Sequence, residues 1–265
     1  MKSIKNTVWW ITGASSGIGK SLVLYILRNG GKVILSSRNK SELQKITKES
    51  DATENNYLVL PLDLENIENP TEMVKTVINK FSRIDYLINN GGISQRSIVS
   101  ETPIEIDRKV MEVNFFGTVA LTKAVLPLMI KQKSGHIAVV SSVVGKFGFP
   151  LRSAYSASKH ALHGFFESLR AENIQNNIKV SIVIPGRINT LISNNSITKD
   201  GSKHGKLDEG QANSMSPDMA APKIINGILR NKKEILVGGK ELLMVHFRRW
   251  TPRLFYYLSN KVSAK

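Results

Sequence analysis

The sequence predicts an α/β fold: a doubly wound parallel sheet of about seven strands with helices on both faces. Two observations support this prediction. Short apolar runs rich in β-branched and aromatic residues alternate with longer amphipathic segments along the chain, which is typical of β-α-β units. The first apolar run leads into a glycine-rich turn and then a helix-like segment, the order found at a phosphate-binding loop.

The strands are expected where the apolar runs are short and continuous, because a parallel strand is buried on both faces. In chain order they are Val8–Ile11, Val33–Ser36, Tyr57–Leu60, Tyr86–Asn89, Ile137–Ser141, Val180–Ile184 and Ile235–Val237. The segments between them are expected to be helical: Ile18–Asn29, Ser41–Ser50, Thr71–Phe81, Ile104–Lys131, Ala154–Asn176 and Pro217–Asn231. Ser216 is a suitable N-cap for the last helix, and Pro217 suits its first position.

The chain is expected to form a single domain over residues 1–265, since no Pro/Gly/Ser-rich linker and no repeat divides it. Residues 188–216 follow the sixth strand and begin with a long polar stretch without periodicity, which predicts a ligand-binding lid or loop. Residues 240–265 form a C-terminal segment in which aromatic residues and arginines are mixed. Such a mixture suits contact with a membrane surface, packing on the chain's own fold, or packing on a neighbouring subunit.

A candidate proton-transfer group is formed by Tyr155 and Lys159, which lie four residues apart on an expected helix and so share one face. A nearby ammonium is expected to lower the pKa of the phenol from its ordinary value of about 10. Ser142 ends an expected buried strand, so its hydroxyl can emerge at the carboxyl edge of the sheet and hydrogen-bond a substrate oxygen.

The glycine-rich turn has the spacing GxxxGxG between Gly13 and Gly19, one residue longer than GxGxxG before the second glycine. Glycines permit a tight turn and close backbone approach, and the free N–H groups at the start of the helix attract a pyrophosphate. The turn therefore predicts a dinucleotide site.

These motifs together resemble the short-chain dehydrogenase/reductase family in its compact one-domain form, from Thr12 to about Thr190. The matching pieces are the TGxxxGIG loop, Asp63 in Leu62-Asp63-Leu64, Asn89-Asn90-Gly91-Gly92, Asn114, Ser142, Tyr155, Lys159, and Pro185-Gly186 with Thr190. Gly91 departs from the family, which usually has alanine there, and a looser loop beside the adenine ribose is expected. The resemblance implies a Rossmann-like fold, a substrate role for residues 188–216, and a homodimer or homotetramer.

The expected site residues follow from the motifs and from this resemblance. The catalytic residues are Asn114, Ser142, Tyr155 and Lys159, and the resemblance implies that Asn114 orders a water next to Lys159. The cofactor-binding residues are Gly13, Ser15, Ser16, Gly17, Ile18, Gly19, Ser37, Arg38, Asp63, Leu64, Asn90, Gly91, Tyr155, Lys159, Pro185, Gly186 and Thr190.

The preferred cofactor is expected to be NADP(H), with NAD(H) as the alternative. Ser37 and Arg38 end the second strand, where an NAD-specific protein would carry an acid for the ribose 2′-hydroxyl. A guanidinium is suited to binding a 2′-phosphate in bidentate geometry.

Composition excludes several classes. The chain carries 37 Lys and Arg against 21 Asp and Glu, a formal net charge of +16, yet it has no basic block and no nucleic-acid module, so no nucleic-acid partner is expected. It has no cysteine, which excludes disulfides and thiolate metal sites. The five histidines have no HxxxH-type spacing, and His160 and His163 are interpreted as surface or packing residues, so no metal is expected.

No secretory signal and no continuous apolar stretch of eighteen residues is apparent, which predicts a cytoplasmic protein, with peripheral membrane contact through the C-terminal segment as one option. The expected function is hydride transfer between a nicotinamide and a carbonyl or secondary alcohol, on a hydrophobic steroid-, retinoid- or lipid-like molecule. Reduction of a 3-oxoacyl carrier protein, a non-catalytic NADP-binding regulator and a basic membrane-surface binder stay open as alternatives.

Overall fold

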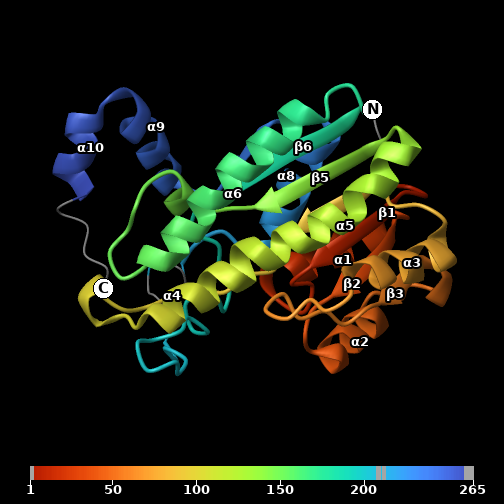
Figure 1. Ribbon diagram of the computed structural model, residues 1–265, viewed down its shortest axis with the longest axis horizontal. Helices are drawn as coiled ribbons and strands as arrows, with labels where there is room; N and C mark the ends of the chain where they lie inside the picture. Colours follow the sequence, from red (N-terminus) through yellow and green to blue (C-terminus); the bar gives the residue numbers. More distant parts are fainter. Residues whose placement is uncertain (1–2, 207–209, 211–212, 260–265) are drawn as a thin grey trace.

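The computed structural model describes residues 3–206, 210 and 213–259. Within this part of the chain, seven parallel strands form one sheet in the order β3-β2-β1-β4-β5-β6-β7 (Figure 1). The strands are β1 (Val8–Thr12), β2 (Lys32–Ser36), β3 (Tyr57–Val59), β4 (Tyr86–Asn89), β5 (Gly135–Val140), β6 (Ile178–Pro185) and β7 (Glu234–Val237). The predicted α/β fold with a Rossmann-like parallel sheet is confirmed.

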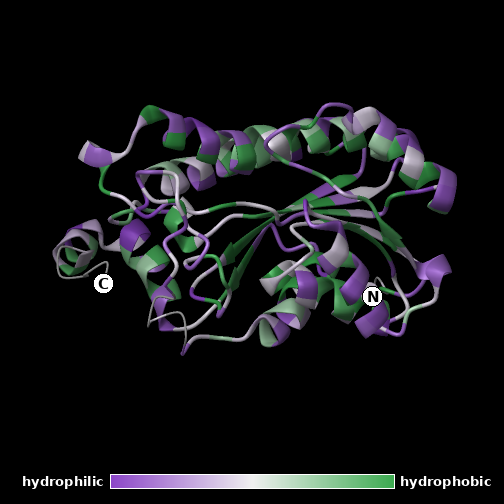
Figure 2. Cartoon of the chain, turned by 90° about the horizontal axis from the view of Figure 1, so that it is seen from below, coloured by the Kyte–Doolittle hydropathy of each residue, from purple (hydrophilic) through white to green (hydrophobic). Residues whose placement is uncertain are grey.

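Helices cover both faces of this sheet, which lies between two helical layers in Figure 2. One face packs against α1 (Gly17–Arg28), α2 (Lys40–Glu49) and α8 (Pro217–Leu229). The other face packs against α3 (Pro70–Phe81), α4 (Ile104–Met111), α5 (Gly117–Gln132) and α6 (Ser153–Glu172). Short helical turns occur at η1 (Glu54–Asn56), η2 (Val99–Glu101), η4 (Val143–Gly145) and η5 (Lys240–Leu242).

Neighbouring residues of each strand pack into different hydrophobic cores, one on each face of the sheet, because successive side chains point to opposite faces. Trp9 packs in the core under α1 and α8, and Trp10 packs in the core under α5 and α6; neither side chain is exposed. Burial on both faces explains why the strands are continuous apolar runs.

Ser216 caps α8 as the sequence predicts: its hydroxyl accepts a hydrogen bond from the Met219 N–H at 3.2 Å. The helix expected over Ile104–Lys131 is also present, but a π-helical stretch, η3 (Glu112–Phe116), interrupts it between α4 and α5. The helix expected to reach Asn176 ends earlier, at Glu172.

One helix is long and apolar enough, by length and composition alone, to resemble a membrane span. The continuous helix Ile104–Gln132 contains an 18-residue window of mean hydropathy 1.6, although it has no unbroken apolar run of that length. Half of that window is buried, and residues of α4 and α5 pack into the core shared with the sheet. Packing against the sheet accounts for the apolar composition.

Two helices were not predicted, α9 (Leu243–Trp250) and α10 (Pro252–Ser259). They lie at one end of the molecule (Figure 1), and residues 260–265 of the C-terminal segment are outside the described part. Phe255 in α10 is buried, and its ring centroid lies 5.2 Å from that of Phe147 in the loop after β5. This segment therefore packs onto the fold through part of its aromatic residues.

Candidate active site

The predicted site residues gather at the carboxyl edge of the sheet, where parallel α/β proteins bind ligands. The glycine-rich turn follows β1, Asn90 follows β4, Ser142 follows β5, and Pro185 ends β6. The sheet order changes direction between β1 and β4, so the glycine turn lies at this switch point.

The glycine turn is held in a shape that only glycine fits. Gly13 and Gly17 have φ of 62° and 52°, in the left-handed region. A Cβ on Gly13 would lie 2.7 Å from the Cα of Gly91, and one on Gly19 would meet the carbonyl oxygen of Gly13. The turn and β4 thus approach each other backbone to backbone, leaving the first N–H groups of α1 at the edge of the sheet.

Asn90 and Thr12 fasten this turn to β4. The Asn90 side-chain amide donates to the carbonyls of Thr12 and Gly13 at 3.1 and 3.2 Å, and the Thr12 hydroxyl accepts the N–H groups of Asn90 and Gly91 at 3.0 and 2.9 Å. Asn90 therefore shapes the phosphate loop through direct hydrogen bonds.

Gly91 does not loosen this region, which corrects the expectation drawn from the missing alanine. A Cβ on Gly91 would lie 2.5 Å from Cδ1 of Leu64, and 3.3 Å from both the Gly13 nitrogen and the Thr12 hydroxyl oxygen. The Leu64 side chain already fills the space that an alanine methyl would take, so the loop is tightly packed.

Two polar side chains at the end of β2, Ser37 and Arg38, have no hydrogen-bond or ion-pair partner among the described residues. The Ser37 hydroxyl is buried without a hydrogen-bond partner, and the exposed Arg38 guanidinium forms no ion pair within the described part of the chain. Asp63 accepts the Glu65 N–H at 3.0 Å, which is a local turn contact. An orphaned buried hydroxyl next to a free guanidinium suits a bound phosphate or ribose.

Tyr155 lies in the first turn of α6, and its phenol is close to the side chain of Ser142. Burial raises the pKa of the Tyr155 phenol, while the Arg152 cation and the Ser142 side chain lower it less. This direction differs from the sequence expectation, because burial outweighs the neighbouring charges.

Lys159 is 4% exposed and shares the face of α6 with Tyr155, its ammonium lying 5.7 Å from the centre of the phenol ring. The ammonium donates to the Val140 carbonyl at 2.8 Å. Burial lowers the pKa of Lys159 to about 8, so the charged form still predominates at pH 7.

Asn114 lies in the π-helical stretch and is fully buried. Its amide group donates to the Ile93 carbonyl and to the Ser158 hydroxyl, both at 2.9 Å, and its oxygen accepts the Ile93 N–H at 2.8 Å. A Cβ on Gly92 would lie 2.9 Å from the Asn114 oxygen and 3.5 Å from the Lys159 nitrogen, so the two side chains are neighbours. A π-bulge at a buried polar residue is frequent at functional sites.

Gln95 holds the start of α6, the helix that carries Tyr155 and Lys159, and the sequence analysis missed it. Its side chain is fully buried, and its oxygen accepts the Ala154 N–H at 2.8 Å, one of the N–H groups in the first turn of α6 that have no partner within the helix. Its nitrogen donates to the Thr102 hydroxyl at 3.1 Å. Because Gln95 is 60 residues away from Tyr155 in the chain, no local pattern indicates this contact.

Glu241 is the second residue that the sequence analysis missed. Its carboxylate accepts the N–H groups of Arg187 and Gly239 at 2.7 and 2.9 Å, and it occupies the space where Gly186 would carry a Cβ. The C-terminal segment is thereby fixed to the Pro185-Gly186 turn. Thr190 lies across from the phosphate loop, since a Cβ on Gly17 would be 2.9 Å from its methyl group.

The expected substrate loop, 188–216, packs next to the site, although residues 207–209 and 211–212 lie outside the described part. Ile197 pairs with Gln95 in an isolated β-bridge: its N–H donates to the Ser94 carbonyl, and its carbonyl accepts the Arg96 N–H, both at 2.8 Å. Asn189 donates to the Met215 carbonyl at 2.9 Å. The loop therefore rests on the segment after β4 that also carries Gln95.

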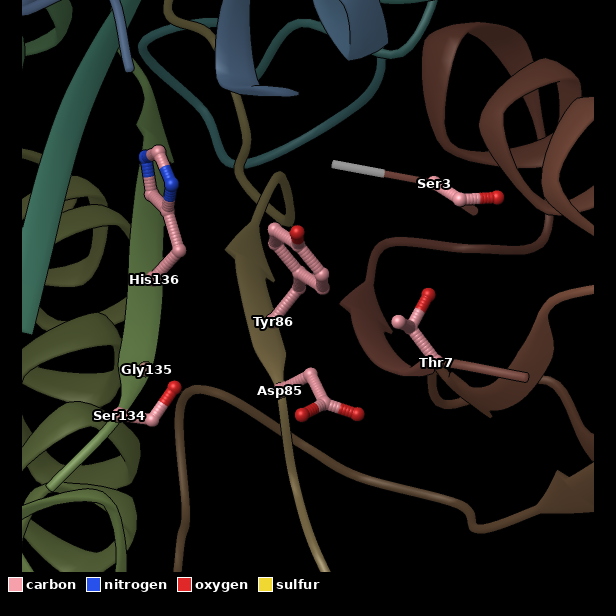
Figure 3. A pocket seen from close by; sticks show the side chains of 7 residues that line it. All are labelled: Ser3, Thr7, Asp85, Tyr86, Ser134, Gly135 and His136. Atoms are coloured by element: carbon pink, nitrogen blue, oxygen red, sulfur yellow. The ribbon is translucent and has the colours of Figure 1, made fainter. Parts of the chain in front are cut away.

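A cavity of about 220 Å³ lies at the opposite edge of the sheet, far from this chemistry. Figure 3 shows Thr7, Asp85, Tyr86 and His136 around it, from the amino ends of β1, β4 and β5. Ligands bind at the other edge in this class of sheet, so we do not assign the cavity to the site.

The arrangement at the carboxyl edge can bind a dinucleotide and move a proton. The tight glycine turn and the orphaned Ser37 hydroxyl fit a nicotinamide dinucleotide along β1 and β2. Beside β5, a buried phenol and a serine hydroxyl meet, with a buried ammonium on the same helix face as the phenol. This is a donor set for a carbonyl oxygen.

Comparison with known proteins agrees with this geometry. The family model for short chain dehydrogenases matches residues 7–201. Over 96% of its length the chain is 46% identical to a Dehydrogenase/reductase SDR family protein 7-like of Drosophila melanogaster, and 40% identical to Dehydrogenase/reductase SDR family member 7B of Mus musculus; in each case the alignment covers 80% of the relative.

Solved structures show the same fold. A short-chain dehydrogenase/reductase from Burkholderia phymatum, solved in complex with NAD, superposes with a TM-score of 0.84 at 20% identity, covering 96% of each chain. A short-chain dehydrogenase from Streptomyces avermitilis has a TM-score of 0.82 at 26% identity, covering 96% of this chain and 97% of its own. The chain belongs to the short-chain dehydrogenase/reductase family, oxidoreductases that act on CH–OH groups.

Proposed function

We propose that this protein is an NADP(H)-dependent oxidoreductase that interconverts a carbonyl and a secondary alcohol. The observation that carries the proposal is that Tyr155 and Lys159 share a buried face of α6, with the Lys159 ammonium 5.7 Å from the centre of the phenol ring and the Ser142 side chain near the phenol. Bound nicotinamide would supply or accept the hydride.

The side chains divide the remaining work. In the reductive direction the Tyr155 hydroxyl donates its proton to the substrate oxygen, and Ser142 stabilises the charge that develops there. Lys159 places a positive charge near the phenol and thereby favours the phenolate that proton donation leaves. Asn114 donates a hydrogen bond to Ser158, which lies on α6 between Tyr155 and Lys159 and donates to the Tyr155 carbonyl. These contacts fix the turn between Tyr155 and Lys159. Alcohol oxidation uses the same groups in reverse.

The preference for NADP(H) rests on Ser37 and Arg38. Arg38 is exposed and forms no ion pair within the described residues, so its guanidinium is available for a 2′-phosphate. The unsatisfied Ser37 hydroxyl can donate to the same group.

The proposed substrate is a hydrophobic alcohol or ketone of the steroid, retinoid or lipid type. Phe147 follows Ser142 by five residues in the chain, and Phe255 of the C-terminal segment packs on it. These aromatic residues favour a free hydrophobic substrate over an acyl group presented by an acidic carrier protein. Exposed apolar residues on the long helix, Ile104 and Phe116, support assembly into a homodimer or homotetramer.

A direct test is the Tyr155→Phe variant, which keeps the ring and removes the proton. Turnover of a panel of ketones, followed by NADPH absorbance, should fall at least about a hundredfold, as is typical for loss of a general acid. NADPH binding, measured by fluorescence titration, should be unchanged. Retained turnover in the purified variant would refute the proposed chemistry.

Cofactor choice has a separate test in Arg38→Asp. Its carboxylate would repel a 2′-phosphate, so kcat/KM for NADPH should fall by about tenfold or more, while kcat/KM for NADH should not fall. Equal losses with the two cofactors would show that Arg38 does not select between them.

A further inference from the structure

His163, Glu167 and Glu234 form a cluster that the proposed hydride transfer does not use. His163 and Glu167 lie one turn apart on α6, and Glu234 begins β7. One potential ligand atom from each residue lies within 4.8 Å of those of the other two. The spacing on the helix is HxxxE, which the sequence analysis did not consider when it expected no metal.

Which ring nitrogen of His163 is free depends on its tautomer. Nε2 of His163 lies 3.0 Å from the Ser141 hydroxyl, which also lies 3.2 Å from the Lys159 carbonyl oxygen. In the tautomer in which Nε2 donates to this hydroxyl, Nδ1 carries a lone pair. His163 is 8% exposed, and Nδ1 is buried without a hydrogen-bond partner among the described residues.

Two carboxylates lie near this imidazole, and the Lys146 ammonium pairs with only one of them, Glu234. Burial, assisted by the nearby Lys146 charge, lowers the pKa of His163 to about 4. A neutral imidazole is the form that ligates metals.

The carboxylates can complete a coordination shell. Glu167 is exposed and forms no ion pair within the described part, so its side chain can rotate inward. Glu234 binds the Lys146 ammonium through one oxygen at 2.5 Å, which leaves its second oxygen for a ligand. Ligand atoms must approach to about 2.0 to 2.2 Å from a zinc ion, a small contraction of the present cluster.

We propose that His163, Glu167 and Glu234 bind a divalent transition-metal cation, with Zn²⁺ as the best chemical match. One imidazole and two carboxylates suit Zn²⁺, whose fourth position would hold water, whereas Mg²⁺ and Ca²⁺ prefer oxygen ligands alone. The ion would tie β7 to the helix that carries Tyr155 and Lys159. Through Nε2 of His163 and Ser141 it would also brace the residue before Ser142.

Equilibrium dialysis and isothermal titration calorimetry of the full chain with Zn²⁺ test the site. We expect one saturable equivalent in the wild type, and affinity lowered at least about tenfold in Glu167→Gln and in His163→Gln, as for loss of a metal ligand or its neighbour. Glu167→Gln is the variant least prone to misfold, because its side chain is exposed.

Two further variants sharpen the result. His160→Gln removes a histidine on the same helix whose Nδ1 is already paired with the Ser156 carbonyl, so it should bind Zn²⁺ like the wild type. Lys146→Met removes the cation that competes for Glu234 and should raise Zn²⁺ affinity. Absence of saturable binding, or equal binding by wild type, Glu167→Gln and His163→Gln, would overturn the proposal.

Discussion

At the scale of single residues, the site carries a buried charge that opposes folding. Lys159 is 4% exposed, and its pKa is lowered to about 8 from an ordinary 10.5 because burial disfavours the charged form. Between these values the unfolded chain binds more protons than the folded one, so stability rises with pH across this window. Below pH 8 the full cost of the buried charge is present.

Lys159→Met should therefore unfold at higher urea than the wild type at pH 7, in the absence of cofactor, while losing activity. The gain is at most about 3 kcal/mol from the size of the pKa shift, reduced by the lost hydrogen bond to Val140, and should shrink as pH approaches 10.5. Urea unfolding from pH 7 to 10 measures it. Lys75→Met, at an exposed site, should show no such trend, and a Lys159→Met protein less stable than wild type at pH 7 would contradict the argument.

The Leu64 side chain occupies the space that a side chain at position 91 would need, so glycine fits there. Gly91→Ala should destabilise the protein by about 1 to 3 kcal/mol through overpacking against Leu64 Cδ1. Adding Leu64→Val removes that carbon and should recover most of the loss. A double-mutant cycle by urea unfolding checks the coupling, and purely additive effects would show that the two positions do not compete for space.

At the scale of elements, the first turns of α6 are held in place by hydrogen bonds from side chains outside the helix. Gln95 accepts the Ala154 N–H directly before Tyr155, and Asn114 binds Ser158 directly before Lys159. Gln95 lies in the segment after β4, and Asn114 lies in η3. The start of α6 is therefore positioned by residues that follow β4 in the chain.

Gln95→Met should leave the buried Ala154 N–H unsatisfied, at a cost of about 1 to 3 kcal/mol, and should loosen the turn that carries Tyr155. We expect kcat to fall while the KM for NADPH changes little, because the glycine turn is untouched. Gln95→Glu retains an acceptor oxygen and should keep more of kcat. Steady-state kinetics with a reactive ketone distinguishes the variants, and equal kcat for Gln95→Met and wild type would rule out a positioning role.

At the scale of the whole molecule, the C-terminal segment contacts the rest of the fold at two places. Glu241 braces the Pro185-Gly186 turn, and Phe255 packs on Phe147 in the loop after β5. Trp250 and Tyr256 are 73% and 54% exposed, so these two aromatic residues do not line the fold and are free to contact a membrane or another subunit.

Two truncations separate these roles. Ending the chain after Trp250 removes α10 and should raise the substrate KM with little effect on the KM for NADPH. Ending it after Lys240 also removes Glu241 and should weaken both. Steady-state kinetics measures this difference, and truncations with identical effects on NADPH would show that Glu241 does not support the cofactor side. Salt-sensitive binding to anionic vesicles that needs the arginines of 248–253 would support membrane contact, at roughly 1 kcal/mol per arginine.

The sequence by itself determined the seven strands and the helices between them, the parallel sheet and the family. These features depend on local patterns: apolar runs of strand length, the glycine spacing after β1, the Ser216 cap, and the four-residue interval from Tyr155 to Lys159. Backbone sterics and helix periodicity act over a few residues, so the chain shows them directly.

Only the tertiary structure decided what surrounds these groups. Burial makes the pKa of Tyr155 higher when the sequence suggested lower, and Leu64 fills the space beside Gly91. Gln95 and Glu241 contact partners that lie 59 and 54 residues away in the chain. Desolvation and packing depend on every atom nearby, whatever its position in the chain. A single sequence contains those neighbours but does not show which of them meet.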